Sequence, residues 1–185
     1  MSTQTLEQAI ATTRAVLVGV SAGQLADSTP CASWKVSELI NHIVGGQYFF
    51  AAGATGEAPG GESPDFSAGD FVSAFDAGSA ACVSAFNGEG VMAKMLTLPF
   101  GQMPGAAFAG LAATDTFQHG WDLAKATGQS TDLSPELAAG LLAGAKMAIS
   151  DGFRGPEGAP FGAATQAPAG ASNADELAAF LGRTV

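Results

Sequence analysis

The sequence predicts an all-α protein, an antiparallel bundle of four main helices with one or two further helices near the C-terminus. Apolar residues recur at steps of three and four over several long segments, which is the period of a helix with one buried face. Stretches rich in Gly and Pro separate these segments. Because 185 residues are enough to bury one core, we expect a single helical domain that spans residues 1–185.

The first helix is expected over about residues 3–22. Gly23 is its expected C-terminal cap. Residues 19–23, GVSAG, match the pattern of a serine nucleophile elbow, but that elbow requires a strand before it and a helix after it. A helical repeat precedes this pattern and a loop follows, so we interpret it as a Gly/Ser-rich helix end. The expected buried face consists of Leu6, Ile10, Thr13, Leu17 and Val20.

The second helix is expected to begin at Ser33, as the N-cap, and to end near Ala52. His42 lies at the edge of its apolar stripe, and Glu38 lies one helical turn before His42. A carboxylate near a helix N-terminus is favourable without any further role. The alternatives for Glu38 are a fourth metal ligand or a partner of a ligand. The stripe itself consists of Val36, Leu39, Ile40, Ile43, Val44 and Phe50.

The third helix is expected over residues 68–87, because Ser67 and Asp70 resemble a capping arrangement. Residues 53–66 precede it. They are rich in Gly and Pro and show no periodicity, which predicts a surface loop. The large apolar side chains of the helix are Phe71, Phe75 and Phe86.

A short strand or β-hairpin is expected over residues 91–100, with the following GQMPG as a turn. The fourth helix should begin near Pro104, continue to about Thr127 and stop at Gly128. It is apolar on nearly all sides, with Trp121 in the core, which is typical of a central helix. Steps of three and four relate Phe108, Leu111, Asp115, His119 and Asp122.

Two further helices are expected near the C-terminus. Ser134 and Pro135 mark the N-cap and the first position of a fifth helix, and Asn173 with Glu176 forms a capping-box pattern for a short last helix. Residues 151–172 between them are irregular, which is typical of loops that are either functional or loosely ordered. The expected packing residues of the fifth helix are Leu137, Leu141, Leu142 and Met147. The residues expected to dock from the irregular stretch are Phe153, Arg154 and Phe161.

The chain has two histidines, and one of them, His119, lies four residues after Asp115. On a helix such a pair shares one face, with Cβ atoms about 5–6 Å apart. The surrounding segment is almost wholly apolar or small, so two ionisable groups there cost free energy unless something satisfies them. A divalent metal ion would satisfy both, and His42 would complete a site with three ligands. We therefore expect a metal centre of His42, Asp115 and His119.

Two imidazoles and one carboxylate suit zinc, with nickel or iron(II) as alternatives, and three protein ligands leave one coordination position open. The competing interpretation is that Asp115 and His119 only hydrogen-bond to each other and to their neighbours. Asp122 would either hydrogen-bond a ligand imidazole or cap an interface with a neighbouring helix. Cys31 is expected to be a packed small residue, since no base or cation stands near it in the sequence.

The composition excludes several classes of partner. Seven basic and 17 acidic residues give a net charge of −10, which disfavours nucleic acids and anionic lipid surfaces. No apolar run reaches the roughly 18 residues of a membrane span. The first residues lack the basic and apolar regions of a secretory signal, and two cysteines make no disulfide framework. We therefore expect a cytoplasmic protein with reduced thiols, for which a homodimer is a further expectation.

Three stretches carry a resemblance to a known family. Residues 34–51, WKVSELINHIVGGQYFFA, resemble the first signature of the DinB-like superfamily, in the branch that contains the metal-binding domain of mycothiol-dependent maleylpyruvate isomerase. Residues 115–129, DTFQHGWDLAKATGQ, resemble its second signature, and LAAFLGR at 177–183 is similar to the ends of small stand-alone members. The resemblance implies an antiparallel four-helix bundle with a metal ion at one end, held by His42, Asp115 and His119. The isomerase has glutamate at the position of Asp115.

The resemblance also implies chemistry with a low-molecular-weight thiol such as mycothiol, because relatives use the metal ion to bind and activate such a thiol. The first functional hypothesis is therefore a metal-dependent thiol S-transferase or isomerase, with residues 53–66 and 151–172 shaping its pocket. The isomerase also has a C-terminal domain, which we do not expect in this chain, so the resemblance does not establish its particular reaction. The alternatives are a non-catalytic metal-binding or sensing module and a metal-dependent hydrolase.

Overall fold

The structure, a computed structural model, describes residues 3–31, 33–57, 64–155 and 161–185. Helices dominate these ranges, which confirms the all-α prediction. The four main helices are α1 (Gln4–Val18), α2 (Val36–Thr55), α3 (Phe71–Phe86) and α4 (Gly105–Ala126). Short 3-10 turns occupy Ala22–Gln24, Phe66–Ala68, Val91–Ala93 and Asp151–Phe153.

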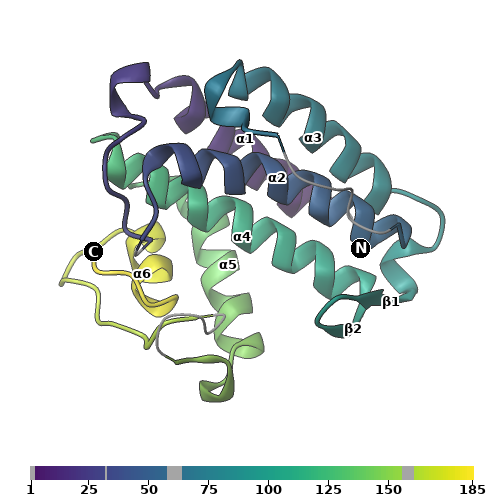
Figure 1. Ribbon diagram of the computed structural model, residues 1–185. Helices are drawn as coiled ribbons and strands as arrows, with labels where there is room; N and C mark the ends of the chain where they lie inside the picture. The colour runs from purple at the N-terminus through teal and green to yellow at the C-terminus, as the bar shows by residue number, and fades with distance from the viewer. Residues whose placement is uncertain (1–2, 32, 58–63, 156–160) are drawn as a thin grey trace.

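The four helices form the expected antiparallel bundle. Figure 1 shows α1 and α4 running in one direction and α2 and α3 running in the other. The closest pairs are α2 with α3 and α1 with α4, and α2 also packs against α4. This last, antiparallel contact brings the middle of α2 against the C-terminal half of α4. The segment of α2 that carries His42 therefore faces the segment of α4 that carries Asp115 and His119.

The core of the bundle is built from large aromatic and aliphatic side chains. Trp121 is fully buried, as predicted, and so are Phe75, Phe108 and Phe117. A small polar network crosses this core: the Thr13 hydroxyl donates to the carbonyl oxygen of Thr116 at 2.8 Å. Burying apolar surface of this extent is the main stabilising contribution to such a fold.

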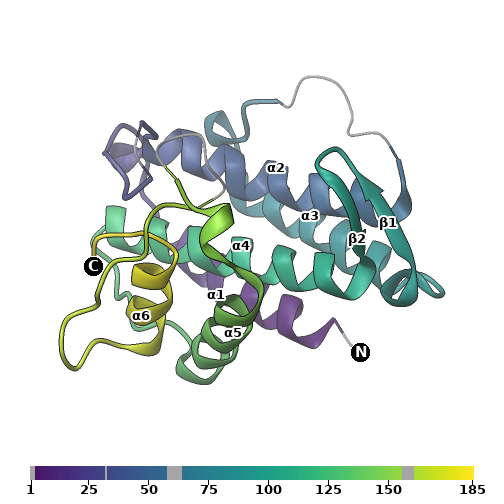
Figure 2. The same cartoon turned by 90° about the horizontal axis from the view of Figure 1, so that it is seen from below.

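A β-hairpin lies between α3 and α4, formed by β1 (Met95–Leu98) and β2 (Gly101–Pro104). The prediction of a hairpin before the fourth helix is confirmed. GQMPG is not its turn, however, because residues 101–104 form the second strand and the chain reverses at Pro99 and Phe100. Figure 2 shows the hairpin at the end of the bundle opposite α6.

Two further helices, α5 (Pro135–Ala148) and α6 (Asn173–Phe180), pack against each other and against α4. They lie together on one side of the bundle (Figure 1). Arg154 docks as expected, since its Nη1 donates to the carbonyl oxygens of Gly162 and Phe180 at 3.0 and 2.9 Å. Phe161 is partly buried against the core. Phe153 is 52% exposed, so its predicted docking is wrong.

Several expected helix ends differ from those observed. The first helix ends at Val18 and is capped by Gly19 rather than Gly23. The second begins at Val36, because Ser33 has a positive φ of 73° and cannot act as its N-cap. At the third helix Asp70 itself is the N-cap and accepts a hydrogen bond from the Ser73 N–H.

The C-terminal helices show two similar differences. Ser172, not Asn173, caps α6 by accepting from the Asp175 N–H. Met147 is 86% exposed, so it does not pack as expected. It lies near the end of α5, where its side chain is in solvent. Among the described residues, none of the helices has the length and hydropathy required to cross a lipid bilayer.

Candidate metal centre

The structure brings the three predicted ligands together. His42 projects from α2, and Asp115 and His119 project from adjacent turns of α4. The His42 Nε2 lies 3.6 Å from Asp115 Oδ2, and the His119 Nε2 lies 3.5 Å from Asp115 Oδ1. One donor atom from each of the three residues lies within 4.8 Å of the others. Whether an ion binds there stays a prediction.

The spacing of these atoms suits a bound ion better than direct hydrogen bonds. Both nitrogen–oxygen separations exceed the roughly 2.7–3.2 Å of ordinary N–H···O bonds. The His42 Nε2 is buried and has no hydrogen-bond partner. Two ligands about 2.0–2.1 Å from a tetrahedral zinc ion stand about 3.3 Å apart. The donor set and the unpartnered nitrogen therefore fit a small divalent ion.

The three side chains are open to solvent on one side. The His42 side chain is 35% exposed and that of Asp115 is 27% exposed, whereas that of His119 is 13% exposed. The ring of Trp34 lies against the two imidazoles, with its centroid 4.8 Å from that of His42 and 5.9 Å from that of His119. The three side chains are thus covered on one side by an aromatic ring and partly accessible to solvent.

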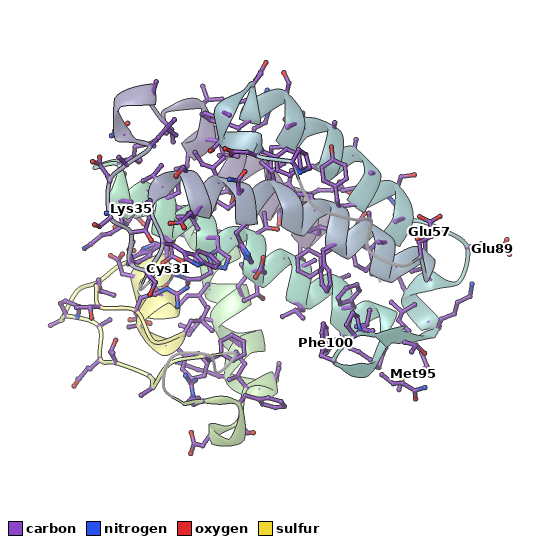
Figure 3. The ribbon with its side chains drawn as sticks, in the orientation of Figure 1. Cys31, Lys35, Glu57, Glu89, Met95 and Phe100 are labelled. Carbon is purple, nitrogen blue, oxygen red and sulfur yellow. The ribbon has the colours of Figure 1, made fainter. Side chains whose placement is uncertain are left out.

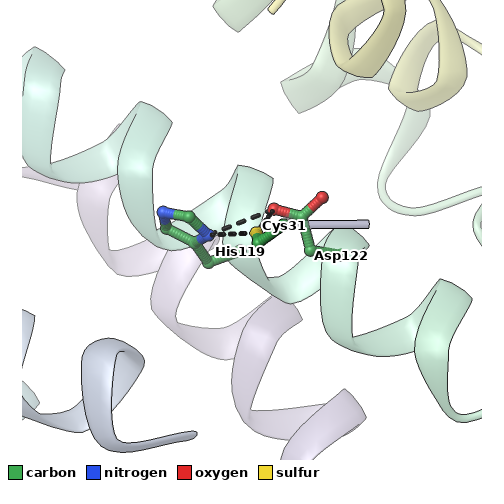
Figure 4. Close-up of side chains that lie close together, drawn as sticks. All are labelled: Cys31, His119 and Asp122. Atoms are coloured by element: carbon green, nitrogen blue, oxygen red, sulfur yellow. Dashed lines mark hydrogen bonds and ion pairs between the residues drawn. The ribbon is translucent and has the colours of Figure 1, made fainter. Parts of the chain in front are cut away.

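Behind His119, its second ring nitrogen faces another carboxylate. His119 Nδ1 lies 3.1 Å from Asp122 Oδ2 (Figure 4), and Asp122 is fully buried. An imidazole that donates its Nδ1–H to Asp122 keeps its Nε2 directed toward Asp115, which is how proteins commonly orient a ligand histidine. Of the two roles expected for Asp122, its position favours the contact with the imidazole.

Asp122 is held by a residue that the sequence did not indicate. Arg183, beyond the end of α6, donates from Nε to Asp122 Oδ1 and from Nη2 to Oδ2, both at 2.9 Å. The amide of Gln118 adds a weaker bond at 3.3 Å. Arg183 is the last residue of the LAAFLGR stretch, for which the resemblance implied no role in the site. No spacing rule connects positions that are 61 residues apart.

Cys31 also belongs to this group. Its Sγ lies 3.1 Å from Asp122 Oδ2, 3.5 Å from Arg183 Nη2 and 3.8 Å from His119 Nδ1. Figure 3 places Cys31 on the segment before α2, at the end of the bundle away from Phe100 on the hairpin. The expectation of a merely packed small residue therefore missed a polar contact with the candidate site.

The charges of the site compensate one another. Burial would raise the pKa of the Asp115 carboxyl, but the charges of His119 and His42 hold it well below its usual range. Burial likewise opposes the charged form of His119, yet Asp115 and Asp122 raise the pKa of this imidazole well above its ordinary value. For Asp122, hydrogen bonds from His119 and Arg183 outweigh burial and lower the pKa to about 2. Both carboxylates are therefore ionised at neutral pH.

Glu38 does not take part in this group. Its side chain is exposed and accepts a hydrogen bond from the Lys35 N–H at 2.7 Å, at the first turn of α2. The interpretation as a favourable charge at a helix N-terminus agrees with this contact.

Comparison with known proteins identifies related chains. The family model described as the mycothiol maleylpyruvate isomerase N-terminal domain matches residues 6–124. An uncharacterized protein of Mycobacterium tuberculosis, present in two strains, is 44% identical over 171 residues, which cover 92% of this chain and 91% of the relative. The crystal structure of the mycothiol-dependent maleylpyruvate isomerase superposes with a TM-score of 0.57 at 15% identity, covering 76% of this chain. This chain spans 66% of that structure's length, and the likeness shows the fold.

Proposed function

Because this chain belongs to the mycothiol maleylpyruvate isomerase N-terminal domain family, we propose that it binds a divalent metal ion through His42, Asp115 and His119. The ion serves a reaction of a low-molecular-weight thiol of the mycothiol type, as an S-transferase or isomerase. Zinc is the first candidate and nickel or iron(II) the alternatives, because two imidazoles and a carboxylate form a borderline donor set. The observation that supports this proposal most strongly is the buried His42 Nε2, which has no hydrogen-bond partner and lies 3.6 Å from Asp115 Oδ2, a separation that an ion bound between the two atoms would explain.

A divalent ion held here would act as a Lewis acid that lowers the pKa of a thiol or water in its open position. The negative charge of the Asp115 carboxylate would offset part of the positive charge of the ion. Asp122 fixes the ring of His119 from behind through the Nδ1 contact at 3.1 Å. Trp34 covers one side and excludes water there, while the half-exposed side of His42 leaves an approach for the thiol.

The test uses purified protein loaded with cobalt(II), whose visible spectrum reports its ligands. We expect the wild-type chain to bind about one equivalent and the His42→Ala variant to bind much more weakly. Adding mycothiol should then produce a thiolate-to-cobalt charge-transfer band. The same titration in the Cys31→Ser variant ensures that the band comes from the added thiol. Cys82 will not interfere, because burial raises the pKa of its thiol to about 12.

Two results would contradict the proposal. If the wild-type chain bound cobalt and zinc no better than His42→Ala, the proposed metal centre would be wrong. If the chain bound the ion but its spectrum did not change at millimolar mycothiol, the proposed binding of a thiol would be wrong.

A non-catalytic metal-binding module is the second candidate, and one observation favours it. The ionisable groups behind His119, namely Cys31, Asp122 and Arg183, contact one another. They therefore offer no obvious proton donor or acceptor to a substrate on the exposed side. In that case zinc should raise the melting temperature while thiols change neither the cobalt spectrum nor the stability.

A further inference from the structure

His119 is shared by two groups of potential metal ligands, one on each side of its ring. The front cluster is His42, Asp115 and the Nε2 of His119. The rear cluster is Cys31, Asp122 and the Nδ1 of His119. In both clusters the donor atoms lie within 4.8 Å of one another. A thiolate, a carboxylate and an imidazole also form a suitable zinc site, so the rear cluster would compete with the front cluster for the same ion and the same histidine.

The rear cluster already contains a positive charge. The guanidinium of Arg183 makes two parallel hydrogen bonds of 2.9 Å with the Asp122 carboxylate, and its Nη2 lies 3.5 Å from Cys31 Sγ. Asp122 is fully buried and the Arg183 side chain is only 19% exposed. A planar, permanently charged guanidinium suits this two-pronged contact better than an ammonium group would.

We propose that Arg183 determines on which side of His119 the metal ion binds. Its guanidinium takes the place of an ion in the rear cluster and fixes Asp122, which in turn holds His119 with Nε2 directed at the front cluster. Arg183 is thus a positioning residue that acts through Asp122. The positioning part of this inference rests on the proposed metal centre at the front cluster, whereas the exclusion of ions from the rear cluster does not.

The backbone at Arg183 is held without its side chain, which makes the residue suitable for substitution. Its N–H donates to the carbonyl oxygen of Ala178 at 2.9 Å, and its own carbonyl oxygen accepts from the Thr165 hydroxyl at 2.6 Å. An Arg183→Met variant therefore keeps the C-terminal segment in place while it removes the cation. This variant leaves the buried Asp122 carboxylate without a positive charge beside it, which costs free energy. An added metal cation can supply that charge.

The experiment compares cobalt(II) titrations of the wild type, Arg183→Met, Arg183→Lys and the Arg183→Met/Cys31→Ser double variant, without added thiol. We expect no thiolate-to-cobalt band in the wild type. Arg183→Met should gain such a band, and the double variant should lose it again. The affinity of the Arg183→Met front cluster for cobalt should fall about 10- to 100-fold, the usual effect of removing a group that orients a ligand histidine. Arg183→Lys keeps the charge, so it should show no band.

Several outcomes would overturn this inference. One is a wild-type band that Cys31→Ser abolishes, because the rear cluster would then bind the ion in spite of Arg183. Another is an Arg183→Met spectrum and affinity equal to those of the wild type. If Arg183→Met does not fold, as judged by circular dichroism, the wild-type and Arg183→Lys titrations still test whether metal ions are excluded from the rear cluster when position 183 is positively charged. A wild-type chain that does not bind cobalt would contradict the proposed function. A band in Arg183→Met that depends on Cys31 would even then support the inference that Arg183 excludes ions from the rear cluster.

Discussion

His119 contacts a carboxylate through each of its two ring nitrogens. Asp115 lies 3.5 Å from Nε2 and Asp122 lies 3.1 Å from Nδ1. The shorter contact is on the buried side, where a hydrogen bond is strengthened by the low local dielectric. The longer contact is on the exposed side, where the spacing leaves room for an ion. The two ring nitrogens of this imidazole therefore lie in different surroundings, Nδ1 against a fully buried carboxylate and Nε2 beside a partly exposed one.

Gly120, the next residue of α4, allows α1 to approach this segment. A Cβ added at Gly120 would lie 2.4 Å from Thr13 Oγ1 and 3.3 Å from its Cα, so the backbone of α1 would have to move. We expect Gly120→Ala to lower the free energy of unfolding by about 1–3 kcal/mol, the usual cost of overpacking. Urea denaturation followed by circular dichroism measures this.

Gly110 on the same helix is a matched control. A Cβ there meets nothing within 4 Å, so Gly110→Ala should raise the stability by about 0.4–1 kcal/mol through the lower entropy of the unfolded chain. Equal effects of the two substitutions would show that the close approach of Thr13 does not limit packing.

Asp175 should make stability depend on pH in the acid range. Its carboxylate accepts a hydrogen bond from Trp121 Nε1 at 2.9 Å. Burial would raise its pKa, but bonds from Trp121 and Ser172 lower the pKa below the ordinary value. The folded state then binds its proton less readily than the unfolded chain. The resulting stabilisation is present above the unfolded pKa of about 3.9 and is lost as the pH falls through the lower, folded pKa.

The test of this prediction is the Asp175→Asn variant, which retains an oxygen acceptor for Trp121. At pH 6 we expect it to unfold at lower urea concentration than the wild type. The difference should shrink between pH 5 and pH 3, because only the wild type can lose the charge of this carboxylate. Other carboxylates titrate in both proteins and cancel. A difference that stays constant with pH would show that the charge of Asp175 contributes nothing.

The three proposed ligands could be predicted from the sequence because helical spacing is a local rule. Asp115 and His119 are four residues apart, and His42 lies on the edge of an apolar stripe. The contacts of Cys31 and Arg183 with Asp122 span 91 and 61 positions. Such separations depend on how whole segments dock, which no periodicity describes. Helical spacing therefore indicates Asp115 and Asp122 on either side of His119, but not the contacts of Cys31 and Arg183 behind it.

At the level of helices and strands, the centres could be predicted and the ends often could not. The end of α4 was correct because Gly128 breaks the helix locally. The start of α2 was wrong because tertiary contacts decide it: Val36 N–H bonds to the Asp27 carbonyl and Ser37 N–H to that of Leu25. These bonds hold the preceding segment in a turn, in which Ser33 takes a left-handed conformation. Propensity gives way to such long-range bonds.

The N-terminus of α6 offers a test of how firmly the C-terminal segment is attached. The Ser172 hydroxyl accepts a hydrogen bond from the Asp175 N–H at 3.1 Å. Replacing Ser172 with Ala leaves this donor without its cap, so we expect a loss of about 1 kcal/mol. Ser172→Asn, which can also cap, should stay near the wild type. Amide hydrogen exchange should show faster exchange in α6 for the first variant only; uniform changes across the chain would contradict a local effect.

For the whole molecule, His119 is the point at which distant parts of the chain meet. The front cluster joins α2 to α4, and the rear cluster joins the segment before α2, α4 and the chain after α6. The bundle carries a net charge of −10, and the ionised carboxylates of Asp115 and Asp122 contribute to it at this end. A bound cation should therefore stabilise the entire fold, because it would lower the repulsion and fix both main helices at once.

This reasoning predicts that the melting temperature depends on metal. A ligand that binds only the folded state stabilises it by about 2.7 kcal/mol at a free concentration of 100 times its Kd. For a chain of this size each kcal/mol corresponds to about 2–4 °C, so zinc should raise the melting temperature by about 5–10 °C and chelation should reverse the rise. His42→Ala should show no such response while folding normally, because His42 is half-exposed and not part of the core. If zinc stabilised both proteins equally, the ion would be binding elsewhere, since only a site that includes His42 can distinguish them.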